Sequence, residues 1–134
     1  MTYLIGYIAA LLSFGVVDAL WLRSMGPILY QPTLGDILLT EVRLIPAVAF
    51  YLLYPIGLVM FAVLPAVKSN SIVSAATSGL VFGAIAYATY DLTNFATLRN
   101  WTLQLTVLDI IYGAAVSGLA ASAGTLAIRA VSSA

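Results

Sequence analysis

The sequence contains neither cysteine nor histidine. The lack of cysteine excludes disulfides, thiol catalysis and cysteine-ligated iron–sulfur clusters. Without either residue type the usual zinc, copper and haem sites cannot form, and the usual general base near neutral pH is also missing. We therefore expect no metal site and no cofactor. These absences, together with the lack of a recognised catalytic motif, argue against an enzyme.

Charged residues are scarce as well. They make up only 7% of the 134 residues, whereas 63% are hydrophobic, and the mean hydropathy is +1.08. A soluble domain carries roughly 25% charged residues, so this composition suits a lipid bilayer rather than water. Because the formal net charge is zero, no basic surface predicts nucleic acid as a partner.

Long apolar runs are what the sequence has in place of charge. A helix needs about 20 apolar residues to cross a bilayer, and four stretches meet this length, at about residues 3–24, 37–65, 71–97 and 102–129. The first stretch lacks the basic residues and the cleavage pattern of a signal peptide, so we expect it to be retained. The predicted fold is all-α, a single transmembrane domain of residues 1–134 built as an integral membrane four-helix bundle.

Proline, glycine and other small residues shape the predicted helices. The second stretch contains Pro46 and Pro55, which predict either a bent, tilted helix or a broken helix that lines a transport site. The connection at residues 25–36 is expected to hold a short interfacial turn, with Tyr30 as an interfacial aromatic residue. Small residues recur four apart in the last two stretches, which predicts close helix packing or a dimer. They include Gly79 and Gly83, and Gly113, Ser117 and Ala121.

The polar residues gather toward one side of the predicted membrane domain. With four spans, all five acidic residues, three of the arginines and both tryptophans lie near the end that holds the connections at about 25–36 and 92–102. Carboxylates that face lipid are costly, so we expect these groups to point inward, toward each other and toward the arginines. The predicted ligand site consists of Asp18, Trp21, Glu41, Arg43, Tyr90, Asp91, Asn94, Arg99, Trp101 and Asp109.

Each of these residues also has a structural interpretation. The carboxylates of Asp18, Asp91 and Asp109 either form a ligand, proton or substrate site or pin the bundle through arginine and tyrosine partners. Arg23 and Arg99 either belong to the site or extend to the lipid headgroups, and the tryptophans are typical of an interfacial aromatic belt. The basic residues on the opposite side favour cytoplasmic termini, in what we expect to be a bacterial inner (plasma) membrane.

A short internal similarity accompanies this asymmetry. The segment VVDALW (16–21) resembles VLDIIY (107–112), because in each an aspartate precedes an aromatic residue by three positions. Six similar residues within apolar helices are weak support for an internal duplication, and the two helices would run in opposite directions across the bilayer.

The stretch YATYDLTNFATLRNW (87–101), followed by Asp109 and Gly113, resembles a bacterial family of predicted membrane proteins known as domain of unknown function 2177. The similarity extends over the whole chain and includes the end of the first span, at Asp18 and Trp21. In this chain Trp101 is followed by Thr102, where relatives are expected to have proline. The resemblance implies a small four-helix integral membrane protein, and it implies no catalytic residues.

Three kinds of function fit these patterns. The first is a membrane protein that binds a small molecule or a lipid headgroup at its one-sided polar site, with Arg43 or Arg99 pairing an anionic group. The second is an accessory or structural subunit, since the small-residue faces suit packing in a homo-oligomer or a larger membrane complex. The third is a transporter, which would have to oligomerise because four helices provide too little wall for a pore.

Overall fold

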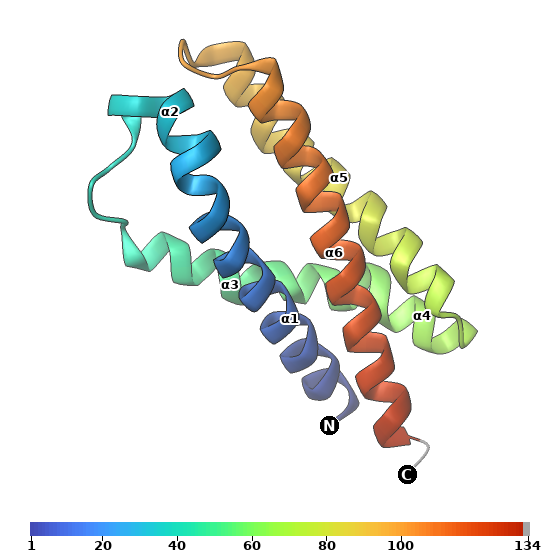
Figure 1. Ribbon diagram of the computed structural model, residues 1–134. Coiled ribbons are helices and arrows are strands. Elements are labelled where there is room, and N and C mark those ends of the chain that lie inside the picture. Colours follow the sequence, from blue (N-terminus) through green and yellow to red (C-terminus); the bar gives the residue numbers. More distant parts are fainter. Residues whose placement is uncertain (133–134) are drawn as a thin grey trace.

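Four apolar stretches form helices long enough to span a membrane, which confirms the predicted all-α fold. The computed structural model describes residues 1–132, and Figure 1 shows the helices packed into one bundle. The spans are Thr2–Ile37, Leu44–Ser69, Ile72–Thr97 and Leu103–Ser132. The best window of each has a mean hydropathy between 1.5 and 2.3, so all four suit the bilayer interior by composition.

The first span stays helical well beyond residue 24, where we expected it to end. Its segments are α1 (Thr2–Met25), the π-helical η1 (Gly26–Tyr30), α2 (Gln31–Leu34) and the 3₁₀ turn η2 (Gly35–Ile37). Pro27 and Pro32 occupy the first turns of η1 and α2, where a missing amide hydrogen is tolerated. The helical backbone is interrupted at Gly35, whose φ of 55° is a conformation that favours glycine. The expected interfacial turn is therefore mostly helical.

The second span begins at Leu44, later than the expected residue 37. It consists of α3 (Leu44–Leu58), the π-helical η3 (Val59–Val63) and α4 (Leu64–Ser69). Pro46 lies in the first turn of α3, whereas Pro55 is inside the helix and buried, with the π-helical segment following it. The span ends at Asn70, which adopts a left-handed conformation with φ of 51°.

The last two spans, α5 (Ile72–Thr97) and α6 (Leu103–Ser132), pack closely along their small residues. A Cβ built on Gly79 would lie 2.7 Å from the Cβ of Ala121, and one built on Gly83 would overlap the carbonyl oxygen of Gly113. The small-residue rows predicted from the sequence thus form the α5–α6 contact, which allows the two backbones to approach.

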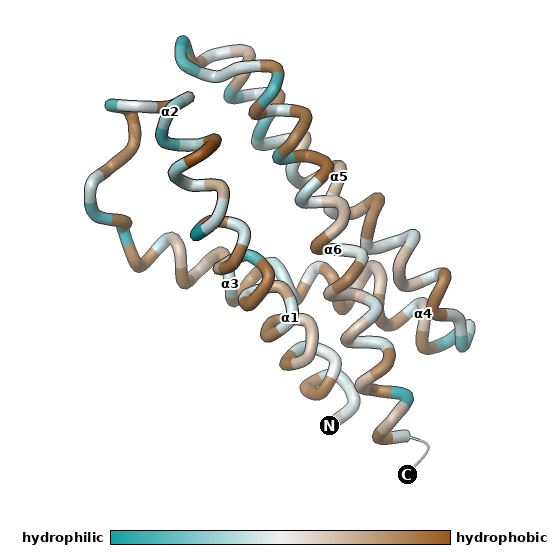
Figure 2. Tube along the Cα trace, viewed as in Figure 1, coloured by the Kyte–Doolittle hydropathy of each residue, from teal (hydrophilic) through white to brown (hydrophobic). Residues whose placement is uncertain are grey.

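Helix α6 lies at the centre of the bundle. In its most apolar window 56% of the residues are buried, against 17% to 28% in the other spans, and Figure 1 shows α6 between α1 and α5. Both termini and the α4–α5 turn lie at one end of the bundle, whereas α2 and the α5–α6 connection lie at the other. We call this second end the polar end, because hydrophilic residues mark both α2 and the α5–α6 connection there (Figure 2).

Candidate functional site

The carboxylate of Asp18, on α1, is the first of two hydrogen-bonded centres near the polar end. Asp18 is buried. It accepts hydrogen bonds from the hydroxyl groups of Tyr51 on α3 and Tyr112 on α6, the latter at 2.7 Å. Three helices therefore meet at one side chain. These bonds satisfy a carboxylate that would be costly to leave unpaired in an apolar bundle.

The carboxylate of Asp109, on α6, is the second centre. The hydroxyl of Tyr30, in η1, donates to Asp109 Oδ1 at 2.5 Å. The same hydroxyl accepts a hydrogen bond from the indole Nε1 of Trp21 at 2.8 Å. Tyr30 therefore bridges α1 and α6 and is not simply an interfacial aromatic residue, as the sequence had led us to expect.

Stacked aromatic rings join the two centres. The rings of Trp21 and Tyr112 have centroids 4.2 Å apart and planes inclined by 9°. The similar segments 16–21 and 107–112 each place an aspartate and an aromatic residue about one turn apart, and the stack brings the two segments together. Each aspartate is bound from the opposite helix, directly by Tyr112 in one case and through Tyr30 in the other.

Asp91, on α5, differs from the other two aspartates because, in the described part of the chain, no tyrosine or other donor group bonds its buried carboxyl, whose neighbour at hydrogen-bonding range is another carboxyl, that of Asp109. Its side chain has 0% exposure, and its carboxyl lies beside that of Asp109. Within residues 1–132, the only buried side-chain nitrogen or oxygen atoms that lack a hydrogen-bond partner are both oxygens of Asp91 and Nε1 of Trp101. Such atoms are rare in folded proteins and call for an explanation.

The unpaired donor lies at the same end of the bundle as the unpaired acceptors, and Tyr90 contacts both sides of this region. Trp101 follows the turn after α5, and its ring packs edge-on against that of Tyr90, with centroids 5.5 Å apart. Tyr90 in turn interacts electrostatically with Asp91 and Asp109. We call the whole set the tyrosine–carboxylate cluster, and it consists of Asp18, Trp21, Tyr30, Tyr51, Tyr90, Asp91, Trp101, Asp109 and Tyr112.

Glu41 and Arg43 lie outside this cluster, contrary to the sequence-based prediction. Because α3 begins at Leu44, both residues fall in the exposed segment 38–43. The second span contributes Tyr51 instead, two turns into the helix. Arg43 and Arg99 do not point inward as the predicted site required, because both side chains are exposed. Arg23 is exposed as well, which fits the alternative that Arg23 and Arg99 extend to the lipid headgroups.

The predicted amide Asn94 is half-buried on α5, and its backbone carbonyl accepts the amide of Leu98 at 2.7 Å, which closes the helix. The side chain of the nearby Asn100 makes a contact with a distant segment of the chain. The Nδ2 of Asn100 donates to the carbonyl oxygen of Leu34 at 3.0 Å and ties the α5–α6 connection to α2. The side-chain amide of Asn100 therefore organises the polar end, whereas Asn94 acts there through its backbone carbonyl.

Three tyrosines of the cluster were not predicted as site residues: Tyr30, Tyr51 and Tyr112. A signal for two of them was present, because Tyr51 and Tyr112 lie well inside apolar spans rather than at their ends. A phenol in that position needs a hydrogen-bond partner, and a buried carboxylate at similar depth is a suitable acceptor.

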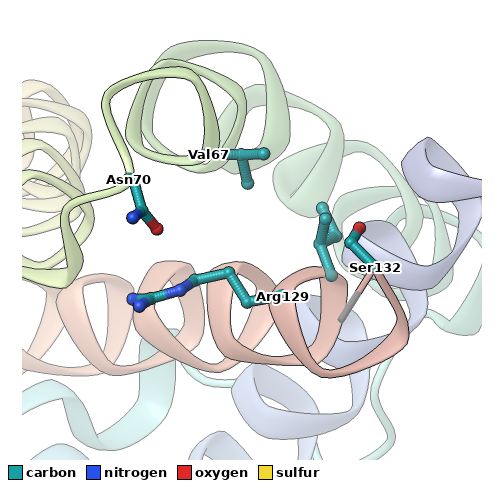
Figure 3. A pocket seen from close by; sticks show the side chains of 5 residues that line it. Val67, Asn70, Arg129 and Ser132 are labelled. Carbon is teal, nitrogen blue, oxygen red and sulfur yellow. The ribbon is translucent and has the colours of Figure 1, made fainter. Parts of the chain in front are cut away.

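Two pockets on the described part of the chain lie away from the cluster. One, with a volume of about 410 Å³, lies between the end of α4 and the end of α6. Figure 3 shows the side chains of Asn70 and Arg129 extending into the same region from facing segments. It is lined by Val67, Asn70, Ile128, Arg129 and Ser132. This pocket is at the opposite end of the bundle from the unpaired atoms, so the two features are separate.

Comparison with known protein families gives a match over most of the chain. Residues 3–126 match the model of a family described as predicted membrane protein, DUF2177. No curated protein and no solved structure matches the chain. The family match covers nearly the whole chain and agrees with the four apolar spans. The chain therefore belongs to this family of predicted membrane proteins of unknown function.

Proposed function

We propose that this membrane protein binds the headgroup of an amine-bearing phospholipid at the unpaired part of the tyrosine–carboxylate cluster. The observation that carries the proposal is the set of three unpaired buried atoms, the two oxygens of Asp91 and Nε1 of Trp101. Ionisable groups inside membrane domains are costly and are commonly functional. A ligand that supplied both a donor and an acceptor would satisfy all three atoms.

The charge of the cluster favours an amine. Three buried carboxyl groups lie in it, whereas the arginines near this end are exposed. An ammonium group entering beside Asp91 would donate charge-assisted hydrogen bonds to its oxygens. The nearby rings of Tyr90 and Trp101 add surfaces that attract a cation.

The surroundings of Trp101 favour a phosphate as the second part of the ligand. Its unpaired indole N–H is a donor only, and it requires an acceptor such as a phosphate oxygen. The exposed Arg99 precedes it by two residues at the same end of the bundle. A phosphoethanolamine headgroup carries the ammonium and the phosphate together. The apolar residues exposed on α5 and α6 would face the acyl chains.

The proposal predicts selective retention of lipid. Native mass spectrometry of the protein taken from mixed nanodiscs of phosphatidylethanolamine and phosphatidylglycerol is expected to show preferential retention of the first. Asp91→Asn keeps the shape of the side chain and removes its charge, so it should weaken this retention by at least about tenfold, the value of a charge-assisted hydrogen bond. Trp101→Phe should weaken it by roughly twofold to tenfold, because it removes a neutral donor.

Asp36→Asn is the matched control, because Asp36 is an exposed acid at the polar end, and it should leave retention unchanged. Equal retention of the two lipids by the unmodified protein would contradict the proposal. Unchanged retention in Asp91→Asn would assign Asp91 a purely structural role beside Asp109.

A further inference from the structure

The connection into the second span and the first turns of α3 are exposed on the outside of the bundle. None of the residues 38–49 is buried, and Ile45 is 86% exposed. Figure 1 shows the connection descending along the outside of the bundle from α2, with the first half of α3 reaching beyond α1. We call residues 38–49 the projecting arm; it ends before Phe50 and Tyr51, whose rings pack against Phe14 of α1. It contrasts with the second half of the span, where Leu58, Ala62 and Val63 are fully buried.

The backbone at the start of the arm is incompletely hydrogen-bonded. Residues 38–43 are not helical, and within residues 1–132 the amides of residues 39–43 donate no hydrogen bond. The segment is short, lies between two membrane spans, and carries exposed apolar side chains at Leu38, Leu39 and Val42. Irregular backbone next to a membrane span is tolerated where protein or water covers it, and it is unfavourable against lipid.

The segment 38–43 carries one acidic and one basic residue, so its charges match those of a second copy of the same segment. Glu41 and Arg43 flank Val42, both are exposed, and neither has an ion-pair partner within the described residues. A two-fold axis close to Val42 would place Glu41 of each copy opposite Arg43 of the other, so that one contact forms twice. An acidic or a basic partner of another kind would pair only one of these two charges.

We propose that the projecting arm is a dimer interface, and that its occupant is the arm of a second copy of this chain. Reciprocal pairs between Glu41 and Arg43 set the register, the uncovered backbone is buried between the copies, and the exposed face of α3 extends the contact. The interface uses no residue of the tyrosine–carboxylate cluster, so it stands independently of the headgroup site.

Site-directed crosslinking tests this interface directly, because the chain has no cysteine of its own. In Val42→Cys the two thiols lie near the two-fold axis, within the short distance that a disulfide requires. Mild oxidation in native membranes is expected to convert most of this variant to a species of twice the chain mass. Leu12→Cys is the matched control, an exposed apolar position on α1, and it should remain monomeric.

Exchanging the charges of Glu41 and Arg43 then tests how the two arms are aligned with each other. Added to Val42→Cys, Glu41→Arg alone and Arg43→Glu alone should each lower the crosslinked fraction several-fold, because like charges then face each other. The combined exchange of Glu41→Arg with Arg43→Glu should restore it. Crosslinking of Val42→Cys no faster than the control, a crosslinked product containing a different protein, or failure of the combined exchange to restore the dimer would each overturn the proposal.

Discussion

Replacing Asp18 by alanine is expected to lower the free energy of unfolding by about 2–4 kcal/mol. The substitution leaves the hydroxyl groups of Tyr51 and Tyr112 without their acceptor, and each unpaired buried hydroxyl costs roughly 1–3 kcal/mol. Interhelical hydrogen bonds in membrane proteins contribute less than this on average. We therefore place the upper end of the expected loss at about 4 kcal/mol rather than at the sum of the two largest costs. Unfolding of the detergent-solubilised protein by increasing amounts of a denaturing detergent, followed by helical circular dichroism, measures the change.

A compensated variant separates the loss of the acceptor from the loss of packing. Asp18→Leu combined with Tyr51→Phe and Tyr112→Phe removes the donors together with the acceptor, and it should be less destabilised than Asp18→Ala because no polar group remains unpaired. Ser13→Ala is a control on the same helix, since Ser13 bonds only a carbonyl of its own helix. A cost below 1 kcal/mol for Asp18→Ala would show that Asp18 does not hold the three helices together.

Gly83→Ala should destabilise the α5–α6 contact by about 2–4 kcal/mol, or prevent the two helices from docking. The added Cβ would overlap the carbonyl oxygen of Gly113 and the side chain of Ser117. Because one of these contacts is with backbone, relief requires the two helices to move apart, and overpacking of this kind costs roughly 1–3 kcal/mol and occasionally more. The same unfolding measurement reports the effect.

Gly15→Ala is the same chemical change at a position on α1 where the new Cβ meets nothing within 4 Å. It should be neutral or stabilising by up to about 1 kcal/mol, because alanine favours the helix over glycine. Equal stabilities for the two variants would contradict the close approach of α5 and α6.

The buried carboxylates illustrate how far the sequence could be interpreted. The position of Asp18 and Asp109 inside apolar runs predicted that their side chains point into the bundle, because lipid does not solvate a carboxylate, and both are buried. Their partners were harder to predict. The sequence offered both arginines and tyrosines as partners without choosing between them. The structure pairs the two aspartates with tyrosines and leaves the arginines exposed, where they keep their hydration.

The start of the second span shows a second limit. The second span was expected to begin at about residue 37, which placed Glu41 and Arg43 one to two turns inside the helix. Because the first span remains helical through Ile37, the chain needs residues 38–43 to change direction, and α3 begins only at Leu44. Two prolines and two glycines were interpreted as a turn, but Pro27 and Pro32 occupy first-turn positions that a helix accepts. Local composition therefore could not locate this boundary.

The sequence by itself determined the helix class, the number of spans and the close-packed rows of small residues. These follow from local requirements of the bilayer, which demands apolar runs of fixed length with their backbone hydrogen bonds closed. Tertiary structure alone decided which tyrosine meets which aspartate. The bond from Tyr112 to Asp18 joins residues 94 positions apart, and the stack of Trp21 on Tyr112 depends on how α1 crosses α6. Such pairings depend on the crossing of whole helices, which no single stretch of sequence specifies.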